Sequence, residues 1–219
     1  MNRTFGAFRT VMAAAVGVTT LFLGGRGGFD GVQLNGKVFD AIDDKLAAWI
    51  ARQRMFFVGT APSGDGGHVN VSPKGPIESL RVLDPHTLAY LDVVGSGAET
   101  IAHLREHGRI VVMLCSFAGP PRILRLHGTG EVLAADAVGF AVAPPAGTER
   151  AVIRVNVERI ADWCGYGVPV MRYEGTRPQY EAWAESKRRT GGDRALDEYV
   201  AQHNARSIDG LPAVDLEPA

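Results

Sequence analysis

The sequence predicts a mainly β protein, an antiparallel barrel or sheet with flanking helices, on three observations. Six strand-like segments follow one another at residues 55–61, 68–72, 87–94, 109–116, 122–133 and 150–160. Short spacers rich in Gly, Pro and Asp separate most of them. Only one short helix, near residues 97–107, interrupts the series, which disfavours a doubly wound α/β sheet.

Helical patterns flank the strands. The segment FDAIDDKLAAWIARQR predicts a helix from about residue 39, with Asp40 as its N-cap and Ile42, Leu46 and Ile50 on one apolar stripe. After residue 175 the pattern becomes helical again, in 176–189 and 194–207, with a break at Gly191-Gly192. We therefore expect a barrel over residues 37–175 and a helical C-terminal extension over 176–219.

Residues 1–36 are predicted to be a flexible or non-native extension. Arg3 and Arg9 precede an apolar run, Val11–Leu23, in the manner of a signal peptide. This run is too short for a transmembrane helix, and a glycine-rich segment follows it instead of a cleavage site. A non-native start, a secretory signal and a disordered extension remain as alternatives, and the first and third are favoured.

Composition excludes several classes of protein. The chain has 219 residues with 23 Lys+Arg, 24 Asp+Glu and a net charge of −1, which gives no overall attraction to nucleic acid or to an anionic membrane. The two cysteines, Cys115 and Cys164, form neither a disulfide framework nor a zinc knuckle. A cytoplasmic protein with reduced thiols is the expectation.

Two turns have the composition of anion sites. The strand at 68–72 ends with Ser72, Pro73 and Lys74, so that a hydroxyl and an ammonium group meet at a rigid turn. The second turn opens the helix near 97–107, where Ser96 and Glu99 have capping-box spacing. A glycine-flanked helix N-terminus also offers free N–H groups to a phosphate. Both turns are consistent with an ordinary structural role as well.

Other sites are weaker or excluded. The glycines at 95–97 do not continue into a dinucleotide-binding fingerprint, since Thr100 stands at its third glycine position and no acidic residue follows at the required distance. His103 and His107 have metal-ligand spacing without the HExxH motif, so a solvated helix face is favoured and no metal is expected. Arg125 and His127 share one strand face, which suits an anion or plain solvent.

Taken in order, the segments MFFVGTAPSGDGGHVNVSPKG, HTLAYLDVVGSGAETIAHLREHGRIVVMLC, PPRILRLHGTGEVL and CGYGVPVM resemble the pyridoxamine 5′-phosphate oxidase-like family. The resemblance covers about residues 38 to 172. It implies a six-stranded antiparallel split β-barrel that binds FMN in a groove at a homodimer interface. The cofactor-binding residues that it implies are Asn70, Ser72, Lys74, Ser96 and Gly97. Val71, which lies between Asn70 and Ser72, and Arg125, on the strand face described above, complete the predicted cofactor-binding set.

The sequence departs from true pyridoxamine phosphate oxidases at two places. Gly97, Ala98 and Glu99 stand where those enzymes have basic residues, and their C-terminal arginine-containing motif is not evident. FMN binding is therefore better supported than vitamin B6 oxidation. The resemblance implies an FMN-dependent oxidoreductase acting on an unknown small molecule, without a catalytic residue that we can name. Alternatives are a deazaflavin-dependent reductase, a flavin-binding or storage protein without turnover, and a non-enzymatic barrel with an acidic partner.

Overall fold

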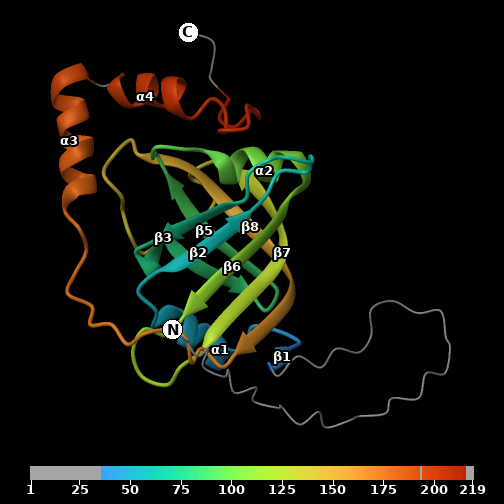
Figure 1. Ribbon diagram of the computed structural model, residues 1–219. Helices are drawn as coiled ribbons and strands as arrows, with labels where there is room; N and C mark the ends of the chain where they lie inside the picture. The colour runs from blue at the N-terminus through green and yellow to red at the C-terminus, as the bar shows by residue number, and fades with distance from the viewer. Residues whose placement is uncertain (1–35, 193, 216–219) are drawn as a thin grey trace, which may run out of the picture. The chain divides into compact units, whose positions relative to one another are not determined.

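A computed structural model describes residues 36–192 and 194–215, and its centre is one eight-stranded antiparallel sheet (Figure 1). The prediction for residues 1–36 falls almost entirely outside the described residues. The strands are Val38–Phe39 (β1), Phe56–Thr60 (β2), Asn70–Lys74 (β3), Leu80–Asp84 (β4), Thr87–Val93 (β5), Arg109–Cys115 (β6), Ile123–Leu133 (β7) and Glu149–Trp163 (β8).

The strands lie in the order β3-β2-β6-β7-β8-β5-β4, and β1 pairs separately with β8. The sheet curls around its core, as Figure 1 shows, with β3 and β4 at its two edges. The prediction of a mainly antiparallel β fold with flanking helices is confirmed. All six predicted strands occur, and the structure adds β1 and β4. Strand β4 is not predicted from the sequence because only Pro85 and His86 separate it from β5. Its last residues, Leu83 and Asp84, have the composition of a spacer.

Alternation along the strands creates the core. In β2, Phe56 and Val58 are buried and the residues between them are less so, because successive side chains point to opposite faces of a strand. The same pattern gives buried positions in β6 and β7. Further buried members of this cluster are Leu88, Tyr90, Ile110, Val112, Leu114, Leu124, Leu126, Ile153, Val155 and Ile160. Full burial of one such side chain contributes about 1.5–3 kcal/mol.

Two helices close the ends of the curled sheet (Figure 1). Helix α1 spans Asp44–Ala51, and its N-cap is Asp43, whose carboxylate accepts a hydrogen bond from the Leu46 N–H at 2.7 Å. The prediction that Asp40 caps this helix is wrong, because the helix begins several residues later. Helix α2 spans Glu99–His107 and ends at Gly108, whose φ of 75° is the left-handed conformation that glycine adopts readily.

The C-terminal extension forms two helices outside the sheet, α3 (Gln179–Gly191) and α4 (Ala195–His203). Gly192, with φ of 70°, separates them at the predicted break. The two helices pack through aromatic rings, since the Trp183 ring stacks on Tyr180 at 5.7 Å and meets Tyr199 edge-on at 5.1 Å. Residues 164–178, which we call the strap, connect β8 to α3 without helix or strand.

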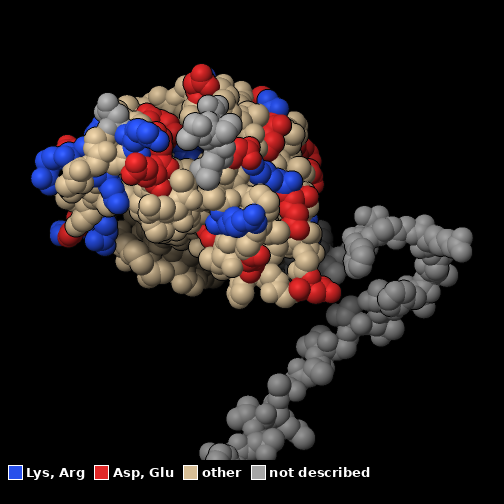
Figure 2. Space-filling model, turned by 90° about the horizontal axis from the view of Figure 1, so that it is seen from above, with Lys and Arg blue, Asp and Glu red and all other residues tan. Residues whose placement is uncertain are grey.

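Charged residues of both signs are interspersed on the face of the molecule seen in Figure 2. That face therefore carries no extended area of one charge. No helix among residues 36–192 and 194–215 combines the length and the apolar character needed to cross a bilayer.

Candidate functional site

A cavity of about 1060 Å³ lies between β3, the end of β5 with its following loop, and the start of α3. Six of the seven candidate cofactor residues line it, although they come from two chain segments more than 20 positions apart. These six are Asn70, Val71, Ser72, Lys74, Ser96 and Gly97. We call this space the barrel-mouth cavity.

Arg125, the seventh candidate, does not line this cavity. It lies on β7, which β2 and β6 separate from β3 in the sheet. Its guanidinium instead stands over the Trp163 ring, 5.9 Å from the ring centre. Strand alternation places Arg125 on the face opposite the buried Leu124 and Leu126, but it carries no information on how far along the sheet that strand lies from β3.

A chain of polar side chains leads from the cavity into the protein. The Ser72 hydroxyl donates to the Asn70 carboxamide oxygen at 3.1 Å. The Asn70 nitrogen donates to the hydroxyls of Thr100 at 3.2 Å and Thr60 at 3.4 Å. Thr60 in turn bonds the His103 Nδ1 at 3.0 Å. Asn70 is therefore held by its neighbours in one orientation at the cavity wall.

His103 is fully buried, and the prediction that it lies on a solvated helix face is wrong. Helix α2 packs on β2, and His103 is on the side that faces Thr60. Its Nε2 has no hydrogen-bond partner among the described residues. Burial lowers the pKa of His103, and the carboxylates of Asp209, Glu99 and Glu106 only partly oppose this effect. His103 is thus neutral at pH 7.

A buried ion-pair cluster forms the floor of the site. The Asp92 carboxylate, on β5, receives Lys74 Nζ at 2.7 Å and the Arg150 guanidinium at 2.7 and 2.8 Å. Burial alone would raise the pKa of Asp92, but the charges and hydrogen bonds of Lys74 and Arg150 outweigh it and hold the pKa below its ordinary value. The carboxylate is therefore ionised and fixes the position of the lysine.

Arg150 reaches Asp92 because the β5–β8 pairing is irregular at this point. Asp92 pairs with Ala151 and the next residue, Val93, pairs with Glu149, so Arg150 is the extra residue of a bulge. Its guanidinium also donates to the Gly97 carbonyl and to the Asn204 side-chain oxygen, each at 2.8 Å. The side chain is only 5% exposed, and its position is fully determined by these partners.

The C-terminal extension holds the loop that rims the cavity. Asn204, just after α4, donates from its side chain to the Gly95 carbonyl at 2.9 Å. The Tyr180 hydroxyl, in α3, donates to the Val94 carbonyl at 2.9 Å. With the Arg150–Gly97 bond, these contacts fix residues 94–97 between the barrel and the two helices. Sequence patterns gave no signal for Asp92, Arg150, Tyr180 or Asn204 as part of a site.

The capping box predicted for Ser96 and Glu99 is wrong. Helix α2 begins at Glu99, its N-cap is Ala98, and no side chain caps it. Ser96 therefore lies two residues before the N-cap and is exposed at the cavity. A Cβ at position 97 would displace the Glu99 carboxylate, which is the free end of a flexible side chain. The first N–H groups of α2 are left without a side-chain acceptor.

No cluster of three or more His, Cys, Asp or Glu side chains suited to a metal ion occurs within the part of the chain that the structure describes. Cys115 is buried in the sheet, as its apolar strand predicted, and Cys164 is exposed at the start of the strap.

Comparison with known proteins identifies the family. A family model described as pyridoxamine 5′-phosphate oxidase matches residues 42–164. The chain is also 40% identical over 196 residues to the pyridoxamine 5′-phosphate oxidase family protein ustO of Aspergillus flavus, with 80% of this chain and 77% of the relative covered. The chain belongs to the pyridoxamine 5′-phosphate oxidase family.

Solved structures similar to this family member are more distant. HupZ of Group A Streptococcus is 23% identical and has a TM-score of 0.45, with 59% of this chain and 99% of that chain covered. A putative pyridoxamine 5′-phosphate oxidase from Listeria innocua is 15% identical, with 53% and 94% covered and a TM-score of 0.35. The FAD binding protein of Mycobacterium smegmatis is 8% identical, with 56% and 95% covered and a TM-score of 0.39. The family assignment rests on the family model and the curated relative.

Proposed function

We propose that the protein is an FMN-dependent oxidoreductase that acts on a small molecule and holds FMN in the barrel-mouth cavity. The observation that carries this proposal is the convergence of Asn70, Val71, Ser72, Lys74, Ser96 and Gly97 on one cavity. The family resemblance implies FMN contacts for Asn70, Ser72, Lys74, Ser96 and Gly97, and Val71 lies between two of them. A cavity of about 1060 Å³ is slightly larger than the usual range for small-molecule and cofactor sites, roughly 300–1,000 Å³.

The phosphate end of FMN fits the part of the cavity between Lys74 and the loop at 95–97. Lys74 donates one of its three N–H groups to Asp92, and its side chain is 22% exposed, so two N–H groups are available to an anion. The exposed Ser96 hydroxyl and the uncapped N-terminus of α2 supply neutral donors and a partial positive charge. These groups would bind the phosphate, while Asp92 keeps the lysine in place.

Apolar side chains line the rest of the cavity and suit a flat ring. They include Val69, Val71, Leu91, Val93 and Val142. When bound, the flavin ring would supply the electron transfer, and the protein would supply orientation and exclusion of water. Asn70 is the polar group best placed to orient a ring, because its carboxamide is already held by Thr60 and Thr100.

A homodimer is part of the proposal. Strand β3 is an edge of the sheet. Val69, just before it, is 73% exposed and Val71, within it, is 65% exposed, and proteins normally cover an edge strand with exposed apolar side chains. A second copy would cover these surfaces. We also propose a cytoplasmic location, which suits the two unpaired cysteines.

Anaerobic reduction of the flavin-loaded protein tests the catalytic part of the proposal. NADH, NADPH or a reduced deazaflavin is added, and the absorbance band of oxidised flavin is followed. Bleaching by one donor at a rate above that of free FMN is the expected result. A protein that binds FMN but is reduced by none of the three donors would be a flavin carrier instead of an oxidoreductase.

A further inference from the structure

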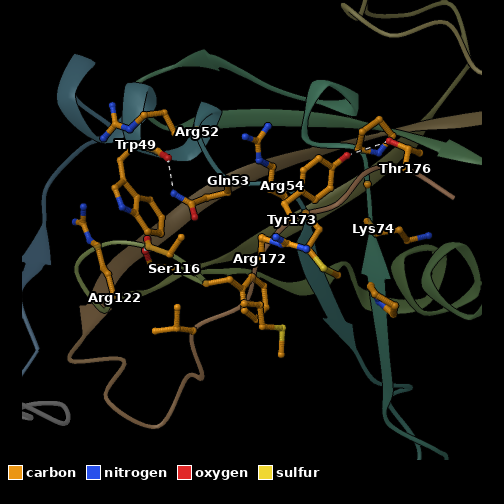
Figure 3. Close-up of a pocket in the computed structure, with 18 of the residues that line it drawn as sticks. Trp49, Arg52, Gln53, Arg54, Lys74, Ser116, Arg122, Arg172, Tyr173 and Thr176 are labelled. Carbon is orange, nitrogen blue, oxygen red and sulfur yellow. Dashed lines mark hydrogen bonds between the residues drawn. The ribbon is translucent and has the colours of Figure 1, made fainter.

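A second cavity, of about 1320 Å³, shares the turn at residues 73–76 with the first, and Figure 3 shows residues that line it. Four parts of the chain line it: the end of α1 with residues 52–55, the turn at 73–76, the β6–β7 connection, and the strap. We call it the arginine cavity because five arginines line it and no Asp or Glu does. These arginines are Arg52, Arg54, Arg122, Arg172 and Arg177.

The positive charge of this cavity is only partly neutralised. Arg122 pairs with Asp162 at 2.9 Å and Arg172 with Glu174 at 2.8 Å. Arg52, Arg54 and Arg177 form no ion pair with any carboxylate of residues 36–192 and 194–215. For a chain with a net charge of −1, three unpaired guanidinium groups around one hollow are a local concentration of charge. An anion bound among these arginines would lower the electrostatic repulsion between them, so the cavity attracts anions.

Aromatic rings hold two of the arginines in place. The Arg122 guanidinium lies 4.8 Å from the centre of the Trp49 ring and 5.4 Å from that of Phe39. Arg54 lies over the Tyr173 ring at 4.7 Å, and Figure 3 shows the two side chains together. Stacking of this kind fixes the plane of a guanidinium before a ligand arrives, which lowers the entropy cost of binding. Lys74, by contrast, lies apart from these arginines in Figure 3 and is bound to Asp92.

The remaining lining is apolar. It includes Met55, Phe117, Pro120, Pro121, Val170 and Met171. A simple inorganic anion would leave these surfaces without a partner, whereas an organic body would cover them. Planar guanidinium groups match carboxylate and phosphate oxygens in pairs. The free arginines also belong to two separate segments, residues 52–54 and the strap, which favours a ligand with two separated anionic groups.

We propose that the arginine cavity binds a small organic molecule that carries at least two carboxylate or phosphate groups on an apolar or aromatic body. Residues 73–76, Thr176 and Arg177 line both cavities, so this ligand would lie next to the barrel-mouth cavity. The dianionic molecule is then the substrate class of the oxidoreductase. This last role rests on the proposed function, whereas the binding itself does not.

Titration calorimetry of the full-length protein at fixed low salt tests the binding. The carboxylate probe is benzene-1,3-dicarboxylate, the phosphate probe is 1,3-phenylene bisphosphate, and the neutral counterpart is benzene-1,3-dicarboxamide. We expect saturable binding of at least one anionic probe and none of the diamide. Arg54→Gln and Arg177→Gln should each raise the Kd of that probe about tenfold or more, since each removes a charge-assisted contact.

Arg189→Gln is the matched control, because Arg189 is an exposed arginine on α3 outside both cavities. It should change the Kd by less than about twofold, as a change in overall charge alone would. The proposal is wrong if neither anionic probe binds, or if all three variants shift the Kd equally. FMN titrations of the same samples separate the two proposals. Probe binding without flavin binding would contradict the proposed function and support the anion site. Flavin binding without probe binding would contradict the anion site and support the proposed function.

Discussion

Asn204 and Arg150 are joined by a hydrogen bond of 2.8 Å, although they are 54 positions apart in the sequence. Asn204 is fully buried and also bonds the Gly95 carbonyl. The family match ends at residue 164, so Asn204 comes from a part of the chain that the family model does not include. The C-terminal extension thus contributes directly to the loop at the barrel-mouth cavity.

We expect Asn204→Ala to loosen this loop. The substitution leaves a buried Arg150 N–H without its acceptor, which costs about 1–3 kcal/mol. Hydrogen exchange of the amides at 94–97 should be faster in this variant than in wild type, and the increase should be larger than for other barrel amides. Tyr180→Phe, which removes the bond to the Val94 carbonyl, should also loosen the loop, with a loss of about 1 kcal/mol.

The matched control for Tyr180→Phe is Tyr166→Phe, since Tyr166 is 82% exposed in the strap. It should leave exchange at 94–97 unchanged. Unaltered exchange of this loop in Asn204→Ala would show that the extension does not hold it.

Asp92→Asn should destabilise the protein strongly. The change removes the negative charge of the carboxylate that pairs with both Lys74 and Arg150, and Arg150 remains buried without a counter-ion. Breaking a buried pair from one side costs about 3–5 kcal/mol. Urea unfolding measures the loss, and Asp136→Asn, at an exposed loop position, serves as the control. A loss below about 1 kcal/mol would mean that the cluster is not the fixed floor of the site.

The regular parts of the fold could be predicted because their signals are local. Turn-rich spacers separate the six predicted strands, and the glycines at 108 and 192 end helices with a positive φ that glycine adopts more readily than other residues. The turn residues Ser72 and Lys74 carried a chemical signal that was visible without a structure. Their meeting with Ser96 in one cavity followed from the family resemblance and not from any local pattern.

The rest of the site depends on contacts that sequence patterns do not contain. Asp92 occupies an ordinary polar position of a strand, and its partners lie 18 and 58 positions away. Arg150 turns toward it only because of a bulge in the β5–β8 pairing. His103 seemed to be exposed because its helix is short and polar, whereas packing of that helix on β2 buries it.

Stability should fall as the pH is lowered through the ordinary pKa of histidine. Burial keeps His103 neutral in the folded protein, so its folded pKa is below 6.5 while the unfolded chain has about 6.5. Between these two values the unfolded state binds more protons, and unfolding becomes easier. Urea unfolding of wild type and His103→Gln between pH 5.5 and 7.5 measures the effect.

The variant should lose part of the pH dependence in this range. His86→Gln, at an exposed turn, should retain all of it. Equal pH slopes for wild type and His103→Gln would contradict a buried neutral histidine.

Lys74→Ala should weaken FMN binding roughly ten- to hundredfold at constant salt, because a charge-assisted contact is worth about 1.5–3 kcal/mol. Ser72→Ala should cost less, about 1 kcal/mol, since its hydroxyl is neutral. Riboflavin lacks the phosphate, so its weaker binding should respond little to the lysine change. The same loss for FMN and riboflavin would assign to Lys74 a role in shaping the cavity instead of binding phosphate.

The central claim is that the barrel-mouth cavity holds FMN. Its most direct test is mass spectrometry of the small molecules released from the purified, denatured protein, followed by titration of the flavin-free protein with FMN. We predict release of FMN, or saturable binding of one FMN per chain that Lys74→Ala weakens. A deazaflavin in the released fraction would replace FMN as the cofactor. Protein that releases no flavin and binds none on titration would contradict the claim.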